Sequence, residues 1–355
     1  MTGWNRREML HATGAVVAGT LLAPMAGAVG TTPPAAEALA HVAPELRPAA
    51  QRMLTLAAQS DPFTDVALPK LRAAGAAGAP AQLADVPVTA RQVPVGRGQP
   101  DVTVYVVNAK PGGAARPAIL HTHGGGFILG SAKQELAYLQ QLARDVDCVI
   151  VTVEYRLAPE TRYSGSIEEN YAGLRWLHAH AATLGVDRTR IAVMGESAGG
   201  GHAALLAIVA RNRGEVPVAF QSLIYPMLDD RTGGAVQLPS FIGAVVWTGT
   251  ANQYGWRSFL GMSPGTARVP AAAVPVRVAD LRGLPPTFIA VGGVDLFAPE
   301  DMTYARRLVE SGVATECLLV PGAFHAFDRI APDTPQAQQF TRAKLAALRR
   351  AFAAT

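Results

Sequence analysis

One serine in this chain lies in the sequence setting of a catalytic nucleophile. Ser197 is the middle residue of the pentapeptide Gly195-Glu-Ser-Ala-Gly199, a G-x-S-x-G motif. An apolar run at 191–194 precedes the motif, and small and aliphatic residues at helical density follow it as far as Gly214. In a strand–turn–helix context of this kind the sharp turn exposes the serine hydroxyl, and the positive end of the following helix points at it. The pattern predicts that Ser197 is a nucleophile.

A serine hydroxyl is a weak nucleophile at neutral pH, so it needs a general base, a group that orients the base, and hydrogen-bond donors for the oxyanion. The segment His121-Thr-His-Gly-Gly-Gly-Phe127 directly follows a predicted strand at 118–120. Its glycines leave backbone N–H groups accessible and let a substrate carbonyl approach closely. We therefore expect an oxyanion hole formed by the N–H groups of Gly125, Gly126 and Ala198.

The general base is predicted to be His325. In one order of serine triads the histidine comes last along the chain, and of the eight histidines only His325 lies beyond the late predicted strands. It belongs to a loop, 321–327, that follows a predicted strand at 316–320. Of the others, we expect His11 in an N-terminal leader, His41, His178 and His180 on helices, His123 as a loop-ordering residue and His202 packed near Ser197.

Several carboxylates lie between the nucleophile and the base, and Asp295 is the preferred third member of the triad. It follows a predicted strand at 287–291 through two glycines, at the carboxyl edge where ligands collect in open α/β sheets. Asp229 and Asp230 follow the preceding strand and are the alternative, although their position also suits a cap or a pair with an arginine. The remaining candidates are Asp280, which is expected to cap a turn, Glu300, Asp301 and Glu316.

Strand and helix patterns alternate along most of the chain and must position these residues. Strands are predicted at 86–93, 102–108, 118–122, 148–154, 191–195, 219–225, 287–291 and 316–320, and helices at 133–144, 167–184, after Ser197, at 299–311 and from Asp333 onward. Continuous apolar strands of this kind predict an α/β fold, with a mostly parallel central sheet flanked by helices.

Two regions do not fit this alternation and are expected to form a cap. Residues 229–283 are rich in glycine and proline and include the large aromatic residues Trp247, Tyr254, Trp256 and Phe259. We interpret them as a cap insertion. Residues 29–85 contain a Pro-rich linker and Ala-rich helical stretches that come before the first strand, so they also cover the sheet rather than build it. The catalytic domain is then 86–228 together with 284–355.

The first 28 residues have the pattern of a twin-arginine signal peptide. Arg6 and Arg7 precede an apolar, Ala/Gly-rich stretch at 12–23, and Ala26-Gly-Ala28 fits a small-x-small cleavage site. The apolar stretch is too short and too weakly hydrophobic for a stable membrane span. We therefore expect export to the periplasm, cell envelope or exterior by the Tat route, with an uncleaved N-terminal anchor or a wrongly assigned start as the alternatives.

Composition narrows the classes of function. The chain has 355 residues, of which 49% are hydrophobic and 16% charged, so a large buried core is expected. The net charge of +4 comes from scattered arginines with no basic stripe, which argues against nucleic-acid binding. The two cysteines, Cys148 and Cys317, lie in apolar strand-like runs and are interpreted as buried free thiols. No metal site and no organic cofactor is indicated, and the oligomeric state is left open.

Several separated motifs resemble those of the hormone-sensitive-lipase-type branch of the α/β-hydrolases, the bacterial esterases with an HGGG signature. The resemblance covers roughly residues 37 to 355. It is carried by the HGGGF run at 123–127, Tyr155-Arg-Leu-Ala-Pro-Glu160, the GESAG motif at 195–199, the DLRGLPP run at 280–286, and Asp295 with Glu300. It implies an α/β-hydrolase fold with a helical cap, built from the N-terminal helices and the insertion, over the Ser197 pocket.

The chain departs from that family pattern at three places. Leu296 stands where the family usually has proline after the acid, Ala326 stands where glycine usually follows the histidine, and residues 161–166 lack the usual prolines. None of these changes removes a catalytic side chain. The first two are expected to act on the geometry of the loops around the triad.

The leading hypothesis is a serine carboxylic-ester hydrolase that forms an acyl-enzyme, with short-chain acyl esters as the substrates implied by the resemblance. Ser197 attacks the ester, His325 takes and returns the proton, and Asp295 orients the imidazole. The same machinery would also serve a deacetylase of acetylated sugars or other small molecules, or an amidase. A non-catalytic ligand receptor is the alternative from another class, since plant gibberellin receptors resemble this fold but lack the histidine. The presence of His325 argues against it.

Overall fold

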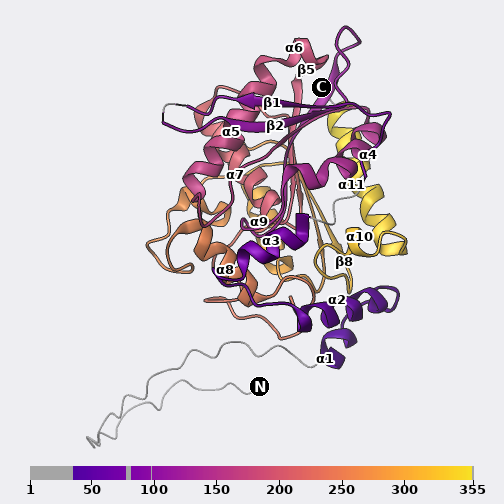
Figure 1. The fold of residues 1–355 in the computed structure, drawn as a ribbon, viewed down its shortest axis with the longest axis vertical. Helices are drawn as coiled ribbons and strands as arrows, with labels where there is room; N and C mark the ends of the chain where they lie inside the picture. Colours follow the sequence, from indigo (N-terminus) through magenta and orange to yellow (C-terminus); the bar gives the residue numbers. More distant parts are fainter. Residues whose placement is uncertain (1–34, 77–80, 97, 354–355) are drawn as a thin grey trace, which may run out of the picture. The chain divides into compact units, whose positions relative to one another are not determined.

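The computed structural model describes residues 35–76, 81–96 and 98–353, which leaves the predicted signal peptide at 1–28 outside the described residues. Eight strands form one sheet in the order β1-β2-β4-β3-β5-β6-β7-β8 (Figure 1). The strands are β1 Val88–Val93, β2 Val102–Val107, β3 Arg116–Thr122, β4 Val149–Val153, β5 Val186–Glu196, β6 Phe220–Ile224, β7 Thr287–Gly292 and β8 Thr315–Val320. The pairs β1–β2 and β2–β4 are antiparallel and all the others are parallel, which confirms the predicted mostly parallel sheet.

Alternating side chains of the central strands point to two separate hydrophobic cores. Ile150 of β4 belongs to the core on one face, whereas Val149 and Val151 belong to the core on the other. The first core is closed mainly by helices α4 (Leu136–Val146) and α11 (Pro335–Ala353), and the second by α5 (Tyr163–Ala179), α7 (Ala198–Arg213) and α9 (Ala298–Glu310). Helices therefore flank the sheet on both faces, as the apolar strands predicted.

Cap elements from both predicted regions share a third core. The N-terminal region forms α1 (Ala35–Ala40), α2 (Arg47–Gln59) and α3 (Leu68–Ala76), of which α2 packs on the first core and α3 on the third. The insertion forms α8 (Gly249–Leu260) and short 3₁₀ turns at Ala271–Ala273 and Pro275–Arg277. Leu68 of α3, Phe127 of the glycine loop and Trp256 of α8 belong to one cluster. In Figure 1 α3 and α8 lie together at one end of the sheet. The cap thus packs directly on the loop predicted to bind the oxyanion.

Helix α8 was not recognisable in the sequence because glycines stand at its start, in its middle and after its end. Thr248 caps it by accepting a hydrogen bond from the Ala251 N–H at 3.3 Å, and Gly261 ends it in a left-handed conformation. Gly255 in the middle is explained by packing, because a β-carbon there would lie 2.6 Å from the Gly126 carbonyl oxygen. The helix therefore presses its backbone against the glycine loop.

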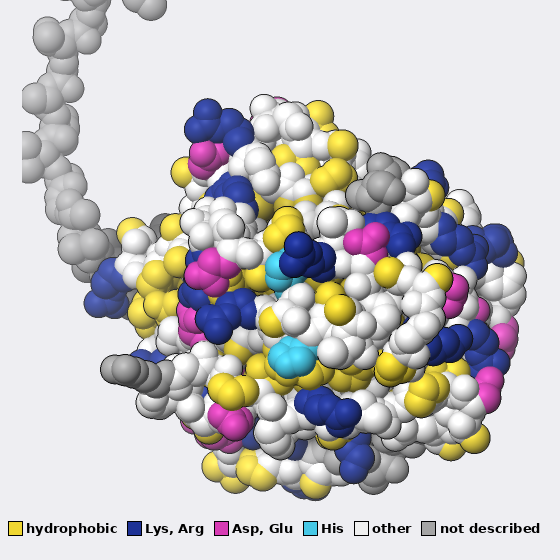
Figure 2. Space-filling model, turned by 90° about the horizontal axis from the view of Figure 1, so that it is seen from above, with side chains coloured by type: hydrophobic (Ala, Val, Ile, Leu, Met, Phe, Trp, Pro, Cys, Tyr) yellow, Lys and Arg dark blue, Asp and Glu magenta, His cyan; other side chains and the backbone are white. Residues whose placement is uncertain are grey.

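On the face shown in Figure 2, Lys and Arg side chains are scattered among acidic and apolar ones. Within the described residues, no helix combines the length and the apolar character needed to cross a membrane. Of the two cysteines, Cys148 is buried as expected, but Cys317 is exposed on the edge strand β8, so the prediction of a second buried thiol was wrong.

Candidate active site

Ser197 lies at the turn between β5 and α7 in the conformation of a nucleophile elbow. Its backbone has φ 58° and ψ −122°, a strained combination for a residue with a side chain. The surrounding backbone holds it there: the Ser197 N–H donates to the Ile224 carbonyl at 2.9 Å, and the Met227 N–H donates to the Ser197 carbonyl at 2.9 Å. A β-carbon at Gly199 would lie 2.0 Å from the Thr122 carbonyl oxygen, so the last glycine of the motif is needed for helix and strand to meet.

The three residues predicted as a triad are joined by two hydrogen bonds. His325 Nε2 lies 3.0 Å from Ser197 Oγ, and His325 Nδ1 lies 2.8 Å from Asp295 Oδ2. A carboxylate accepts hydrogen bonds only, so the proton of neutral His325 belongs on Nδ1 and Nε2 can accept the serine proton. Asp295 is fully buried, and its second oxygen accepts a hydrogen bond from the Phe297 N–H at 3.0 Å.

Asp295 and His325 meet because they follow neighbouring strands. Asp295 comes just after β7 and His325 just after β8, and these two strands pair in parallel. The two departures from the family pattern are accommodated here. Ala326 adopts the left-handed conformation, with φ 58°, that glycine would take more easily, and the side chain of Leu296 is buried against the backbone of Gly243. Neither change separates Asp295 from His325.

The predicted oxyanion donors have no competing hydrogen-bond partners among the described residues. Within the described residues, the backbone N–H groups of Gly125, Gly126 and Ala198 make no hydrogen bond. Ala198 is the first residue of α7, where N–H groups point out of the helix and carry its positive end. Gly126 has φ +60°, and a β-carbon on it would lie 2.1 Å from Cη2 of Trp247. The loop conformation thus depends on glycine and on the cap aromatic that covers it.

A stacked pair of rings orders the glycine loop from beneath. The rings of His123 and Tyr155 are parallel, with centroids 4.1 Å apart, and the Tyr155 hydroxyl donates to the His123 carbonyl at 2.6 Å. Burial lowers the pKa of His123 to about 4, so this histidine is neutral at ordinary pH. These contacts agree with the expectation that His123 orders the loop. They also show that Tyr155, the first residue of the YRLAPE stretch, packs against the loop and hydrogen-bonds to it.

Sequence reasoning missed a set of polar contacts that joins helix α3 to the glycine loop. Arg72 of α3 donates to the Ile128 carbonyl at 2.8 Å and to the Ala158 carbonyl at 2.8 Å, and it pairs with Glu160 at 2.8 Å. One guanidinium therefore ties the N-terminal cap to the end of the glycine loop and to the YRLAPE turn. The glutamate of that turn was the only sequence signal for such a partner, and nothing nearby in the sequence pointed to Arg72.

The other candidate acids have structural partners of their own. Asp229 pairs with Arg231 at 2.7 Å, and Asp230 pairs with Arg277 at 2.6 Å, as their position at the start of the insertion suggested. Glu300 accepts the N–H of Leu228 at 2.6 Å. The remaining pairs are Asp280 with Arg282 and Glu316 with Arg350. Asp301 is the exception, because it is fully buried and neither of its oxygens has a hydrogen-bond partner in the described part of the chain.

Glu196, the residue before the nucleophile, carries a buried negative charge that the sequence analysis did not single out. Its two oxygens bind His121 Nε2 at 2.8 Å and the Tyr138 hydroxyl at 3.0 Å. Burial is the largest influence and opposes ionisation, but His121, Lys344 and Arg329 together outweigh it and lower the pKa of Glu196 to about 2. The carboxylate is therefore charged throughout the neutral range.

No group of three or more His, Cys, Asp or Glu side chains among the described residues could hold a metal ion.

Comparisons with known proteins agree with this geometry. A family model described as alpha/beta hydrolase fold matches residues 119–329. Esterase LipI of Mycobacterium tuberculosis is 35% identical over 69% of this chain and 76% of its own, and ethyl acetate hydrolase of Pseudomonas putida is 30% identical over 72% and 79%. The solved structure of a bacterial heroin esterase superposes with a TM-score of 0.78 at 34% identity, covering 88% of this chain and 99% of that one.

The chain therefore belongs to the hormone-sensitive-lipase-type branch of the α/β-hydrolase fold family. It is a carboxylesterase-type enzyme that hydrolyses carboxylic esters, as are the relatives that share its fold and sequence. The predicted fold and enzyme class are confirmed over the receptor alternative.

Proposed function

We propose that Ser197, His325 and Asp295 hydrolyse short-chain acyl esters through an acyl-enzyme. The observation that carries the proposal is the continuous chain of hydrogen bonds from Asp295 through His325 to Ser197 Oγ. Asp295 holds the imidazole in the tautomer that leaves Nε2 free to accept a proton. The serine at the elbow then has its base, and the base has its orienting group.

The reaction follows from this geometry in two halves. Ser197 Oγ attacks the ester carbonyl while its proton passes to His325 Nε2, and the negative oxygen of the tetrahedral intermediate receives hydrogen bonds from the N–H groups of Gly125, Gly126 and Ala198. Collapse breaks the bond to the alcohol, which leaves with the proton from Nε2. In the second half water gives its proton to Nε2 and attacks the acyl-enzyme, and the acid is released as Ser197 recovers its proton.

The preference for short acyl chains rests on the cap aromatics. Trp247 lies against Gly126 of the proposed oxyanion hole, and Phe63 of the N-terminal cap packs on Trp247 with ring centroids 5.6 Å apart. A large ring held from both sides next to the reacting carbonyl leaves little room for a long chain. The name of the ethyl acetate hydrolase, 30% identical to this chain, points the same way.

The test is a panel of p-nitrophenyl esters of increasing acyl length, run beside acetylated sugars and an anilide of the best acyl group. We expect the highest kcat/KM at acetate to butyrate, weaker activity on the sugars and none on the anilide. Ser197→Ala should lose several orders of magnitude in kcat while the folded state is kept. A Ser197→Ala variant that keeps a tenth of the activity, or that is still labelled at the active site by a serine-reactive phosphonate, would contradict the assignment.

We further propose that the enzyme is exported by the twin-arginine route. The support is the sequence alone, Arg6-Arg7 followed by the weakly apolar stretch at 12–23 and Ala26-Gly-Ala28. The route carries folded proteins, which suits a chain with only two cysteines, one buried just before β4 and the other exposed on the edge strand β8.

A further inference from the structure

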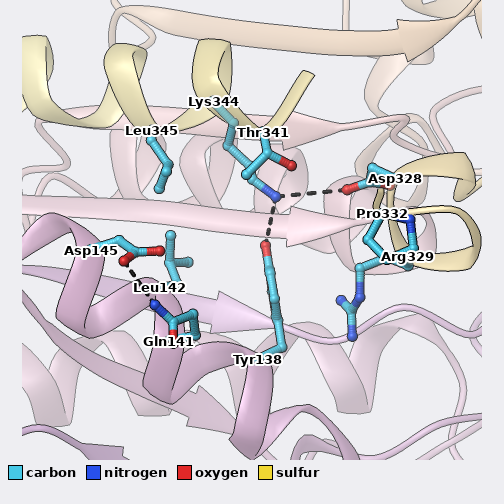
Figure 3. A pocket seen from close by; sticks show the side chains of 10 residues that line it. All are labelled: Tyr138, Gln141, Leu142, Asp145, Asp328, Arg329, Pro332, Thr341, Lys344 and Leu345. Atoms are coloured by element: carbon cyan, nitrogen blue, oxygen red, sulfur yellow. Dashed lines mark hydrogen bonds and ion pairs between the residues drawn. The ribbon is translucent and has the colours of Figure 1, made fainter. Parts of the chain in front are cut away.

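Lys344 is a buried lysine on α11 with no part in the chemistry described above. It is only 2% exposed. Because lysine is almost never fully buried unless it is paired, its partners inside the protein are informative. Its ammonium lies 2.9 Å from the Tyr138 hydroxyl and 3.8 Å from Asp328 Oδ2, beside a cavity of about 260 Å³ between α4 and α11 (Figure 3). One positive charge therefore contacts two partners, Tyr138 and Asp328, which connect it to different parts of the proposed active site.

The first direction leads to the nucleophile. Burial raises the pKa of Tyr138 well above its ordinary value, so the hydroxyl keeps its proton. It accepts a hydrogen bond from Lys344 and donates one to Glu196 Oε1 at 3.0 Å. Glu196 immediately precedes Ser197, so the position of its carboxylate bears directly on the strained backbone of the elbow.

The second direction leads to the base. Asp328 lies three residues after His325, in the short helix α10 (Phe327–Ile330) that ends the histidine loop. Its Oδ1 accepts a hydrogen bond from the Tyr225 hydroxyl at 3.1 Å, and the Tyr225 ring meets the His325 ring edge-on with centroids 4.9 Å apart. Asp328 therefore fixes both the end of the loop and the aromatic ring against which the imidazole rests.

We propose that Lys344 is a positioning residue for ester hydrolysis, which holds the nucleophile elbow through Tyr138 and Glu196 and the base loop through Asp328 and Tyr225. This rests on the proposed roles of Ser197 and His325. An ammonium that contacts both the Tyr138 hydroxyl and Asp328 restrains both sides at once. An apolar side chain would leave the buried Asp328 without its ion pair and would remove one of the positive charges near Glu196. Misplacement of reacting groups by about 1 Å costs up to about 10²-fold in rate.

The test compares Lys344→Met with Arg342→Met, an exposed position on the same helix. We expect Lys344→Met to lower kcat by about ten- to a hundredfold with KM changed less than about twofold, and Arg342→Met to behave as wild type. Lys344→Arg should restore most of kcat, because it returns the charge and the cavity beside it has room for the larger head group. Phosphonate labelling of Ser197 in the wild type separates this result from a failure of the proposed function itself.

The pH profile distinguishes positioning from simple loss of stability. His325 contacts Asp295 and Ser197 and rests against Tyr225 and Phe297. Behind them the charged groups are Glu196, Asp328, Lys344 and Arg329, the last stacked on Tyr138 and paired with Glu135. Removing the Lys344 charge leaves the two carboxylates less compensated, which favours protonated His325. The acid limb of kcat/KM should therefore move to higher pH.

Two further variants keep the proposal testable if Lys344→Met does not fold. Tyr138→Phe removes the hydroxyl that links Lys344 to Glu196, and Asp328→Asn removes the charge that links Lys344 to the histidine loop. Each should lower kcat by less than Lys344→Met does. Where Lys344→Met does fold, combining it with either variant should give a loss in kcat that is less than additive. The proposal is overturned if Lys344→Met lowers only the melting temperature and leaves kcat and the acid limb of the kcat/KM profile unchanged. It is also overturned if Tyr138→Phe and Asp328→Asn both match the wild type.

Discussion

The indole of Trp247 lies directly on the backbone of Gly126, so close that a β-carbon at Gly126 would be 2.1 Å from Cη2 of the ring. A residue of the predicted cap insertion and a residue of the proposed oxyanion hole are therefore in close contact, and each limits the position of the other. In the proposed function, this contact links acyl-chain selectivity to the geometry that stabilises the transition state.

Replacing Trp247 by alanine should widen the acyl site. We expect the ratio of kcat/KM for p-nitrophenyl octanoate to that for the acetate to rise about tenfold or more, since each buried methylene contributes about 0.8 kcal/mol. The measurement is the ester panel. Trp176→Ala is the matched control, because Trp176 stacks on His180 of the α5 C-terminus, away from the cap. An unchanged ratio would show that the ring does not limit the acyl chain.

Replacing Gly126 by alanine should damage the oxyanion hole. The new β-carbon both strains a backbone at φ +60° and collides with Trp247, so the loop must shift. Loss of one oxyanion donor costs about 10²–10³-fold in kcat. The double variant Gly126→Ala/Trp247→Ala removes the collision and keeps the strain, so it should recover part of the loss. If the double variant were as slow as the product of the two single effects, the collision would not be the cause.

Replacing Asp295 by asparagine should lower kcat by roughly two to four orders of magnitude with the fold intact, because the histidine loses its orienting carboxylate. Asp229→Asn and Asp230→Asn are the controls, since these carboxylates bind Arg231 and Arg277 instead. We expect each to change kcat by less than about tenfold, with Asp230→Asn also lowering the melting temperature because its ion pair is buried. A near wild-type Asp295→Asn enzyme would reverse the assignment.

Asp301 should make the protein less stable as the pH rises. Burial above all, with the neighbouring Glu300, Asp295 and Cys317, raises the pKa of this carboxyl well above its usual value. For a group whose pKa is raised in the folded state, the stabilising contribution is full below the unfolded pKa and is lost as the pH rises toward the folded value. Asp301→Asn keeps the volume but cannot ionise.

The measurement is the melting temperature from pH 4 to pH 9. Wild type and Asp301→Asn should differ little at pH 4, and the variant should be the more stable at pH 8, by about 1 kcal/mol or more if the buried carboxylate stays unpaired. The exposed Asp333→Asn variant is the control and should follow the wild type at every pH. Parallel curves for Asp301→Asn and wild type would mean that the pKa of Asp301 is the same in the folded and the unfolded protein, which would contradict the prediction.

Changing Arg6 and Arg7 together to lysine should leave an unprocessed precursor in the cytoplasm, because the twin-arginine pathway reads the pair itself and not only its charge. Immunoblots of cytoplasmic and exported fractions, made with and without the substitutions, measure the outcome. Normal export and processing of the Lys-Lys variant would contradict the proposed route.

Local sequence alone was enough for the elements that carry the proposed triad. Ser197, Asp295 and His325 each follow an apolar strand, and parallel strands bring their carboxyl ends to one edge of a sheet, so the three residues could be placed together before any coordinates. The paired arginines at 229–231 and 280–282 were likewise within reach, because both partners are close in sequence.

The residues that only the tertiary structure revealed act across long sequence separations. Arg72 reaches Glu160, Lys344 reaches Tyr138, and Trp247 covers Gly126, and no periodicity or motif relates these partners to one another. Helix α8 was hidden for the same reason, since the glycine in its middle, Gly255, is explained by contact with a loop far away in the chain. Short-range pattern determines strands, turns and the order of catalytic groups, whereas the contacts that hold those groups in place arise when packing of the cap and α11 brings distant side chains into the same buried volume.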